Sequence, residues 1–248
     1  PMPAPGEDSL LLMSANLMYG RCDLGALTRQ VLREDPDVVV LQEYTPAAAR
    51  AMVAALSDRY PHRVEHIRDD AFGQAVFSRR PFASPARLFP PGDGWREPQA
   101  LVTVALGAGH VAIMNIHLLP PSSFDWVREH RVQAARLAEQ VAMDFAEHGA
   151  VVLAGDFNAT PESPHLRALV RVGFAAAHEE AGRGRASTWP RTSWLRHVPG
   201  IRLDHALGAG VEFIESRTGE DFGSDHRPVL ARFVLGDRAS RGQAPAQP

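Results

Sequence analysis

The sequence predicts a single α/β domain with mixed β-sheets. Strand-like apolar runs alternate with helical patterns early in the chain, whereas later strand-like runs follow one another as hairpins. The 248 residues contain no repeat of fixed period and no convincing linker, so one domain is expected. We expect it to span residues 9–235, with flexible tails at 1–8 and 236–248, because the second of these is polar and Pro-rich.

The first half of the chain carries most of the predicted strands. Apolar runs bounded by turn residues predict strands at 9–17, 37–43, 73–82, 100–106 and 110–118, the last two joined by a GAG hairpin. The pattern DLGALTRQVLRED predicts a helix capped by Asp23. The pattern TPAAARAMVAALSDRY predicts a second helix, with Thr45 as its cap and Pro46 at its first position.

The second half begins with a long amphipathic helix, SSFDWVREHRVQAARLAEQVAMDFAEHG, which Gly149 closes. Next comes VVLAGDFNATPES, where five apolar or small residues run into an Asp, as in a buried parallel strand. The segments RLDHALGAGVEFIESRT and SDHRPVLARFVL are again typical of strands.

Composition excludes several classes of function. The formal net charge of -3 gives no global attraction to nucleic acid or to anionic membranes. All 26 basic residues are arginine, which excludes Schiff-base lysine chemistry and a P-loop lysine. The single cysteine cannot form an intramolecular disulfide. No apolar run reaches the roughly 18 to 20 residues of a membrane span, so the chain as given is expected to be soluble, either cytoplasmic or exported with its targeting segment absent.

Polar residues gather where the predicted strands end. Asp156 and Asn158, two positions apart, project to the same side of the strand end, whereas Phe157 points back into the packing. Similar clusters supply Asn16, Glu43, His117, Asp204 with His205, and Asp225 with His226. Each residue alone could be a helix cap, an ion-pair partner or a buried core residue; His205 is expected to be structural.

Several carboxylates together at strand ends predict a cation. Burying them costs several kcal/mol per ion unless a cation or a hydrogen-bonding partner offsets the loss of hydration. Carboxylate oxygen, amide oxygen and water are the ligands that Mg²⁺ or Mn²⁺ prefers. One thiol and scattered histidines argue against structural zinc.

Eight motifs in order resemble the endonuclease/exonuclease/phosphatase superfamily, typified by deoxyribonuclease I, abasic-site endonucleases and neutral sphingomyelinases. They are SANLMYG, PDVVVLQE, GQAVFSRRPF, MNIHL, LAGDFNATP, STWP, RLDHAL and GSDHRPV, and they cover residues 9–235. GDFN and SDHRP together are highly specific, whereas LQE alone is weak. The resemblance implies a four-layer sandwich, with two packed mixed β-sheets flanked by helices.

The resemblance also implies roles for the strand-end residues. It makes Glu43 the principal metal carboxylate, with Asn16 beside it and Asp225 completing the site directly or through water. Asp156 and Asn158 would hold and activate the attacking water.

Two histidines and one glutamine complete the roles that the resemblance implies. His226, oriented by Asp204, would contact a phosphoryl oxygen or act as the acid/base partner, and His117 would act near the leaving group. Gln74 stands where many members have Asn, so a contact between Gln74 and the substrate phosphate is less secure.

Residues 181–202 carry five arginines, two tryptophans and no acid. Basic residues interleaved with aromatic ones can hold phosphates and stack on bases, with Arg191 and Arg196 as candidates. The same segment could dock on an anionic lipid surface through Trp194 and Leu195. It could also be a solvated loop in which Trp189 packs.

Three hypotheses on function follow. The first is a Mg²⁺-dependent phosphodiesterase, with Mn²⁺ able to substitute, acting as a monomeric nuclease on DNA or RNA by in-line attack of water. The second is a hydrolase of phospholipid or lipid-linked phosphate. The third, an inactive binding module on the same fold, is disfavoured because no expected polar position has been lost.

Overall fold

A computed structural model describes residues 8–89, 99–184, 186–191 and 199–236. Twelve strands in this part of the chain form two six-stranded mixed sheets. The first sheet has the order β11 (Val211–Thr218), β12 (Val229–Leu235), β1 (Ser9–Asn16), β2 (Val38–Gln42), β4 (Gln74–Ser78), β3 (His62–His66). The second has the order β5 (Arg87–Phe89), β6 (Gln99–Leu106), β7 (Gly109–His117), β8 (Val151–Asp156), β10 (Asp204–Ala209), β9 (Ala175–Ala176).

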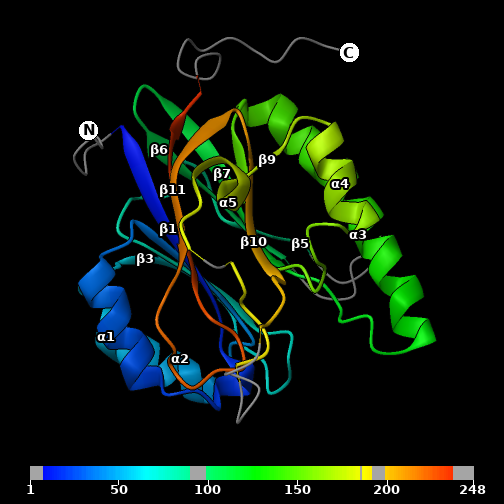
Figure 1. The fold of residues 1–248 in the computed structure, drawn as a ribbon. Coiled ribbons are helices and arrows are strands. Elements are labelled where there is room, and N and C mark those ends of the chain that lie inside the picture. The colour runs from blue at the N-terminus through cyan, green and yellow to red at the C-terminus, as the bar shows by residue number, and fades with distance from the viewer. Residues whose placement is uncertain (1–7, 90–98, 185, 192–198, 237–248) are drawn as a thin grey trace.

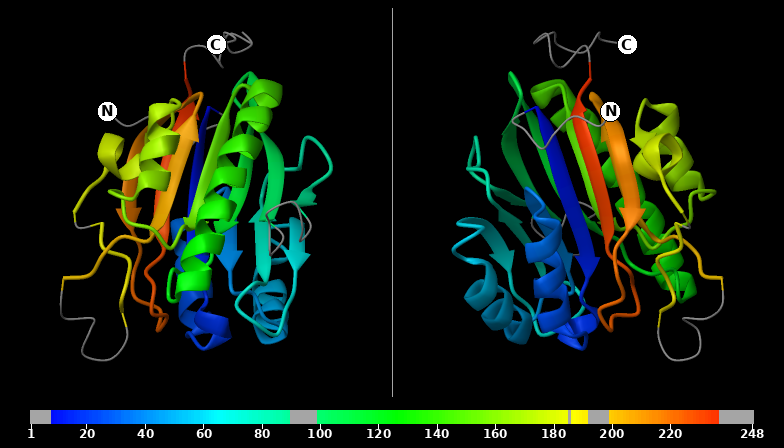
Figure 2. Two further views of the ribbon diagram at one scale, coloured as in Figure 1. Left: turned by 90° about the vertical axis from the view of Figure 1, so that its right-hand side faces the viewer. Right: turned by 60° about the vertical axis from the view of Figure 1, so that its left-hand side comes forward.

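The sheets pack face to face and helices cover both outer faces, so the predicted four-layer sandwich is confirmed (Figures 1 and 2). Helices α1 (Leu24–Glu34) and α2 (Pro46–Leu56) cover the first sheet, and α3 (Phe124–His148) and α4 (Pro164–Arg171) cover the second. The short helix α5 (Ala177–Ala181) follows β9, and a 3₁₀ turn, η1 (Met18–Gly20), follows β1.

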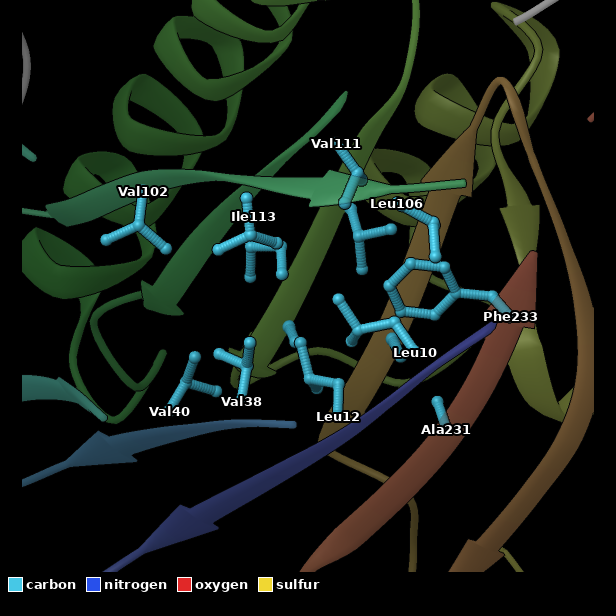
Figure 3. Packing of buried hydrophobic residues seen from close by; sticks show 14 of the residues in the cluster. Leu10, Leu12, Val38, Val40, Val102, Leu106, Val111, Ile113, Ala231 and Phe233 are labelled. Atoms are coloured by element: carbon cyan, nitrogen blue, oxygen red, sulfur yellow. The ribbon is translucent and has the colours of Figure 1, made fainter. Parts of the chain in front are cut away.

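Apolar side chains fill the space between the two sheets. Leu10, Val40 and Phe233 of the first sheet face Val102 and Leu106 of the second (Figure 3). All five are fully buried, and burial of each such side chain contributes about 1.5–3 kcal/mol. Two further apolar clusters hold the helices on the outer faces. Both faces of the central strands are therefore covered, as their continuous apolar runs predict.

Both predicted helix caps are confirmed. The side chain of Asp23 accepts from the backbone N–H of Ala26 at 2.8 Å, and the side chain of Thr45 accepts from that of Ala48 at 3.3 Å. Pro46 opens α2 as expected. These caps satisfy backbone donors that have no partner inside the helix.

Six short elements were not predicted from the sequence: β3, β5, β9, α4, α5 and η1. The strand β3 (HRVEH) lies at a sheet edge and has one apolar residue among five, so it shows neither an apolar run nor an alternation of apolar and polar residues. The helix α4 has only eight residues, although Ser163 caps it. The predicted limits 9–235 stay a prediction, although β1 begins at Ser9 and β12 ends at Leu235.

Strand register aligns the site residues in two rows. In the second sheet, His117, Asp156 and Asp204 are direct neighbours on β7, β8 and β10. In the first sheet, Asn16, Gln42 and Gln74 are neighbours on β1, β2 and β4. Both rows lie at the end of the sandwich away from the start of β1 and the end of β12 (Figure 1). None of the helices in the described part of the chain combines the length and apolar character that a transmembrane span needs.

Candidate active site

A cavity of about 590 Å³ opens at the end of the sandwich where the two rows lie. Its polar lining comes from both sheets and comprises Glu43, Asp70, His117, Asp156, Asn158, Asp225 and His226. Its remaining wall is mainly apolar and includes Tyr19, Phe72, Pro120, Pro121, Trp189, Ile201 and Leu203. Six of the eleven predicted site residues thus face one cavity. Asn16 and Asp204 contact three of these six, Glu43, Asp156 and His226, from behind.

Asp156 ends β8 directly beside His117 of β7. The chain can pack so closely here because residue 155 is glycine: its φ is 148°, and a Cβ at this position would lie 1.9 Å from the carbonyl oxygen of Ile116. His117 Nε2 lies 3.9 Å from Asp156 Oδ2 and 4.0 Å from Glu43 Oε1. The GD pair of the motif GDFN therefore brings a carboxylate to the imidazole.

Asn158 sits in the turn after β8 with a φ of 47°, a conformation that Asn tolerates better than most residues. Its backbone N–H donates to Asp156 Oδ1 at 2.8 Å, and its side-chain Nδ2 donates to the carbonyl of Leu118 at 2.8 Å. Phe157 between them is fully buried, as predicted. The turn thus fixes the Asp156 carboxylate and links it to the segment after His117.

His226 and Asp204 form a buried pair. His226 Nδ1 lies 2.8 Å from Asp204 Oδ2, and His226 Nε2 lies 3.7 Å from Asp156 Oδ2. Because an ionised carboxylate only accepts, Nδ1 carries the proton and Nε2 is turned toward the cavity. The hydroxyl of Thr188 accepts from the backbone N–H of Asp204 at 3.2 Å.

Glu43 follows β2 with a φ of 58°, which is uncommon for a residue other than glycine. Its Oε1 accepts from Asn16 Nδ2 at 3.1 Å, and its Oε2 accepts from the backbone N–H of Tyr19 at 2.8 Å. Asn16 Nδ2 also donates to Asp156 Oδ2 at 3.1 Å, while Asn16 Oδ1 accepts from the N–H of Met18. Asn16 therefore joins the carboxylate of one sheet to that of the other.

Burial and charge shift the pKa of four of the titratable groups in the cavity. Burial, assisted by the charge of Asp225, raises the pKa of Glu43. Burial also raises the pKa of Asp156 to about 6, with nearby Asp204 adding to the effect. Burial lowers the pKa of His117. Burial opposes the charged form of His226 as well, but the carboxylates of Asp204 and Asp156 outweigh it and raise the pKa of His226 to about 10.

The residues at this site fit a divalent cation. The hydrogen bonds that Glu43 accepts come from neutral groups, and the nearby charge of Asp225 makes its ionised form less favourable. A cation between these carboxylates would relieve that repulsion. In the described part of the chain, Asp156, Asp204 and His226 also offer three ligand atoms within 4.8 Å of one another. Because Asp204 Oδ2 already hydrogen-bonds to His226 Nδ1, we assign Asp204 to orienting the imidazole and not to holding the cation.

Two of the three predicted substrate contacts, Gln74 and Arg191, are not among the residues that line the cavity. Gln74 is 1% exposed, and its carboxamide bonds to the backbone N–H of Ala100 and to Gln99 instead of lining the cavity. Arg191 donates its backbone N–H to the carbonyl of Asp225 at 2.8 Å, which puts it beside the loop of His226. Arg196 lies outside the described residues. His205 is buried, with Nε2 lying 2.8 Å from the carbonyl of Ala159, as expected of a structural residue.

Sequence reasoning missed the residues that hold the site from behind. Ser224 donates its hydroxyl to the carbonyl of Asn16 at 2.8 Å and accepts from the N–H of His226. Gln99 bonds to both backbone groups of His117. Ser224 stands within the quoted motif GSDHRPV, and Thr188 within STWP, so both could have been examined. No signal in the sequence marks Gln99.

The chain belongs to the Endonuclease/Exonuclease/phosphatase family, whose sequence pattern it matches over residues 13–226. This match spans the site from the end of β1 to His226. Members of this family are hydrolases, and the site described above has the acidic residues and histidines that such chemistry uses.

Solved structures share the fold at low sequence identity. An endonuclease/exonuclease/phosphatase from Beutenbergia cavernae is 21% identical, with a TM-score of 0.73, over 92% of this chain and 72% of that one. The 3'-5' exonuclease NExo from Neisseria meningitidis is 21% identical, with a TM-score of 0.72, over 91% and 100%. Sphingomyelinase C from Streptomyces griseocarneus is 21% identical, with a TM-score of 0.65, over 90% and 99%.

A curated relative, a UPF0294 protein from Vibrio campbellii, is 27% identical over 129 residues. That match covers 52% of this chain and 41% of the relative. The chain thus matches less than half the length of this relative.

Proposed function

We propose that this protein is a divalent-metal-dependent phosphodiesterase that hydrolyses its substrate by in-line attack of an activated water, and that nucleic acid is its substrate class. The observation that carries the proposal is that both sheets bring acidic residues and histidines to one cavity. The second sheet brings His117, Asp156 and, through Asp204, His226, while the first sheet brings Glu43 and Asn16.

Glu43 and Asp225 would hold the cation, preferably Mg²⁺. Asn16 supports this pair, because its Nδ2 fixes Glu43 Oε1 and its Oδ1 is held by Met18. When bound, a divalent cation would neutralise charge on the phosphate and stabilise the departing oxygen.

Asp156 and Asn158 would hold the attacking water. Asp156 Oδ1 is fixed by the N–H of Asn158, and its Oδ2 by Asn16, so the carboxylate cannot swing away from the cavity. A carboxylate in hydrogen-bond reach of water can take its proton as water attacks phosphorus. The bond from water oxygen to phosphorus then forms as the bond to the leaving oxygen breaks.

The two histidines take different parts. His226 has Nδ1 tied to Asp204 and Nε2 turned to the cavity, which suits a charged donor to a phosphoryl oxygen. His117 lies on the other side of Asp156, where its Nε2 can donate to the leaving oxygen. The raised pKa of His226 agrees with its part as a charged donor.

Two observations support nucleic acid as the substrate. A 3'-5' exonuclease has the same fold over 91% of this chain. Residues 181–202 are rich in arginine and tryptophan, and two of them, Trp189 and Ile201, belong to the cavity wall. Arginine contacts to phosphates and stacking on tryptophan would hold a strand at the mouth.

A lipid phosphodiester is the second candidate, favoured by the apolar character of the mouth. Phe72 and Trp189 line the cavity, and Ile201 is 44% exposed at its wall. Phe124, two residues after the wall residue Ser122, is 97% exposed. A sphingomyelinase C shares the fold.

The deciding experiment compares plasmid DNA, single-stranded RNA, an aryl phosphodiester and a sphingomyelin vesicle at matched ionic strength. We expect turnover on the nucleic acids and the aryl diester, loss of turnover in EDTA, and recovery with Mg²⁺ or Mn²⁺. Full activity in excess EDTA contradicts the metal requirement. Turnover confined to the vesicle contradicts the nucleic-acid assignment and selects the second candidate.

Four variants separate the two substrate classes. If residues 181–202 hold a nucleic-acid backbone, Arg191→Gln and Arg196→Gln should each flatten the decrease of kcat/KM with added salt. The aryl diester, which has a single charge, should respond much less. For a lipid substrate, Phe124→Ser and Trp194→Ala should lower activity on vesicles and leave the aryl diester unaffected.

A further inference from the structure

Two buried glutamines lie between the sheets next to the active site. Gln99 begins β6 in the second sheet and is 0% exposed, and Gln74 begins β4 in the first sheet and is 1% exposed. Neither is among the residues that line the cavity. Both nevertheless connect to His117, the last residue of β7.

The side chain of Gln99 binds His117 as a peptide group would. Its Oε1 accepts from the backbone N–H of His117 at 2.8 Å, and its Nε2 donates to the backbone carbonyl of His117 at 3.3 Å. A carboxamide offers the same acceptor and donor as a peptide, and buried backbone groups need partners. A side chain therefore fixes the end of β7.

Gln74 in turn fixes the orientation of Gln99. The backbone N–H of Ala100 donates to Gln74 Oε1 at 3.0 Å, so the Nε2 of Gln74 must face the other way and donates to Gln99 Oε1 at 3.2 Å. This chain of hydrogen bonds runs from the backbone N–H of Ala100 through Gln74 and Gln99 to the backbone N–H of His117. A backbone N–H can only donate, so both ends of the chain are fixed. Both carboxamides thus have only one orientation that satisfies their neighbours.

The bonds from Gln99 fix the backbone position from which the imidazole of His117 extends into the cavity. Its Nε2 is 3.9 Å from Asp156 Oδ2 and 4.0 Å from Glu43 Oε1, beyond hydrogen-bond distance from both. A movement of about 1 Å toward either carboxylate would create a direct hydrogen bond. That bond would occupy the nitrogen that the leaving group needs.

We propose that Gln99 and Gln74 are positioning residues, which hold the backbone of His117 so that its imidazole stays clear of both carboxylates and free to serve the leaving group. The proposal rests on the proposed phosphodiesterase function. The alternative is a purely structural role, in which the two glutamines only join the two sheets. In that case, substitutions would change stability and leave His117 in place.

The test uses Gln99→Met and Gln74→Met, because Met has a similar length and no carboxamide. Gln30→Met is the matched control: Gln30 is 2% exposed on α1, and its side chain makes no hydrogen bond within the described structure. Three quantities are measured: the NMR signals of the His117 backbone amide and imidazole nitrogens without metal, kcat and KM on an aryl phosphodiester with Mg²⁺, and Tm.

We expect both variants to shift the His117 signals and to lower kcat about 10- to 100-fold, since a misplacement of about 1 Å at a reacting group can cost that much. KM should stay within about 3-fold of the wild-type value. The double variant should be little worse than the more damaging single one, because the two residues act through one chain of bonds. Gln30→Met should leave the His117 signals and kcat unchanged.

If Gln74→Met lowers Tm and leaves the His117 signals unchanged, the positioning role is wrong and the two glutamines only join the sheets. If Gln99→Met does not fold, Gln74→Met and Gln74→Glu decide alone, since neither removes a direct partner of His117. Gln74→Glu keeps the acceptor for Ala100 and loses the donor to Gln99, so it should also shift the signals. If the wild type turns over no diester, the proposed function fails, while the NMR comparison still decides the positioning role.

Discussion

His226 and Asp204 share a hydrogen bond of 2.8 Å although they come from different sheets of the sandwich. Asp204 begins β10 in the second sheet, whereas His226 lies in the loop that leads to β12 in the first. The bond closes one side of the cavity and gives the imidazole a fixed orientation. The first prediction concerns this pair.

Replacing Asp204 with Asn should lower kcat about 100-fold or more and leave the fold intact. The carboxamide keeps the size of the side chain but loses the charge that most favours the protonated imidazole, so the pKa of His226 should fall. Steady-state kinetics and an NMR titration of the His226 ring measure the two effects. An unchanged titration in a folded variant would show that Asp204 does not support the imidazolium.

Replacing Asp156 with Asn should lower kcat by at least about 100-fold. Without metal, Tm should hold or rise, because burial and the charge of Asp204 disfavour the ionised carboxylate. Kinetics and thermal unfolding in EDTA check both statements. Near wild-type turnover would remove Asp156 from its assigned role with the attacking water.

The stability of the protein should fall as the pH drops from about 6.5 to 4, partly because of His205. Burial lowers the pKa of this imidazole from 6.5 to about 4. Between these two pH values the unfolded chain binds a proton at His205 that the folded protein does not bind. The contribution of His205 to stability is therefore complete above about pH 6.5 and decreases as the pH falls toward 4. The contribution is up to about 3 kcal/mol.

His205→Gln is the variant that isolates this effect. The carboxamide can still donate to the carbonyl of Ala159 but does not titrate in this range. Denaturant unfolding at pH 7, 6, 5 and 4 should give a shallower loss of stability for the variant. Equal slopes for the two proteins would mean that His205 is protonated in the fold.

Arg80 should matter for stability and not for turnover. It donates to Asp37 Oδ1 at 3.1 Å, to the carbonyl of Ser9 at 2.7 Å and to that of Ala105 at 2.9 Å, at the end of the sandwich away from the active site. Arg80→Met removes a partner from a carboxylate whose side chain is 11% exposed. The expected cost is about 2 kcal/mol of unfolding free energy, with kcat unchanged.

Arg33→Met provides the matched comparison for Arg80→Met. The side chain of Arg33 is 51% exposed and pairs with Glu34 and Glu220, so its loss should cost about 0.5 kcal/mol or less. Chemical denaturation of both variants measures the difference. Equal destabilisation would contradict the distinction between buried and exposed ion pairs at these two sites.

The strands that carry the active site could be predicted because local patterns determine them. Apolar runs ending in a polar residue identify β1, β7 and β8, and the polar residue at each end marks the site. The resemblance then put Glu43 and His226 in the same place, which spacing along the chain alone cannot do. The short edge elements lack such patterns, so β3 and β5 were missed.

Contacts between the two sheets could not be predicted. Gln74 and Gln99 are 25 positions apart and meet only because β4 and β6 face one another across the interior. A carboxamide at the start of a strand is typical of an exposed turn as much as of a buried bridge. Only the family resemblance suggested Gln74 as a substrate contact, whereas its hydrogen-bond partners, Gln99 and Ala100, come from the second sheet.

Pairing of the first strand with the last has a consequence for the order of events during synthesis. The hydroxyl of Ser224 reaches the carbonyl of Asn16 across 208 positions of the chain, and β12 pairs with β1 along six residues. A ribosome therefore releases Glu43 and His117 long before His226 exists to complete the cavity. The nascent polypeptide therefore lacks a complete cavity until β12 has emerged and docked on β1.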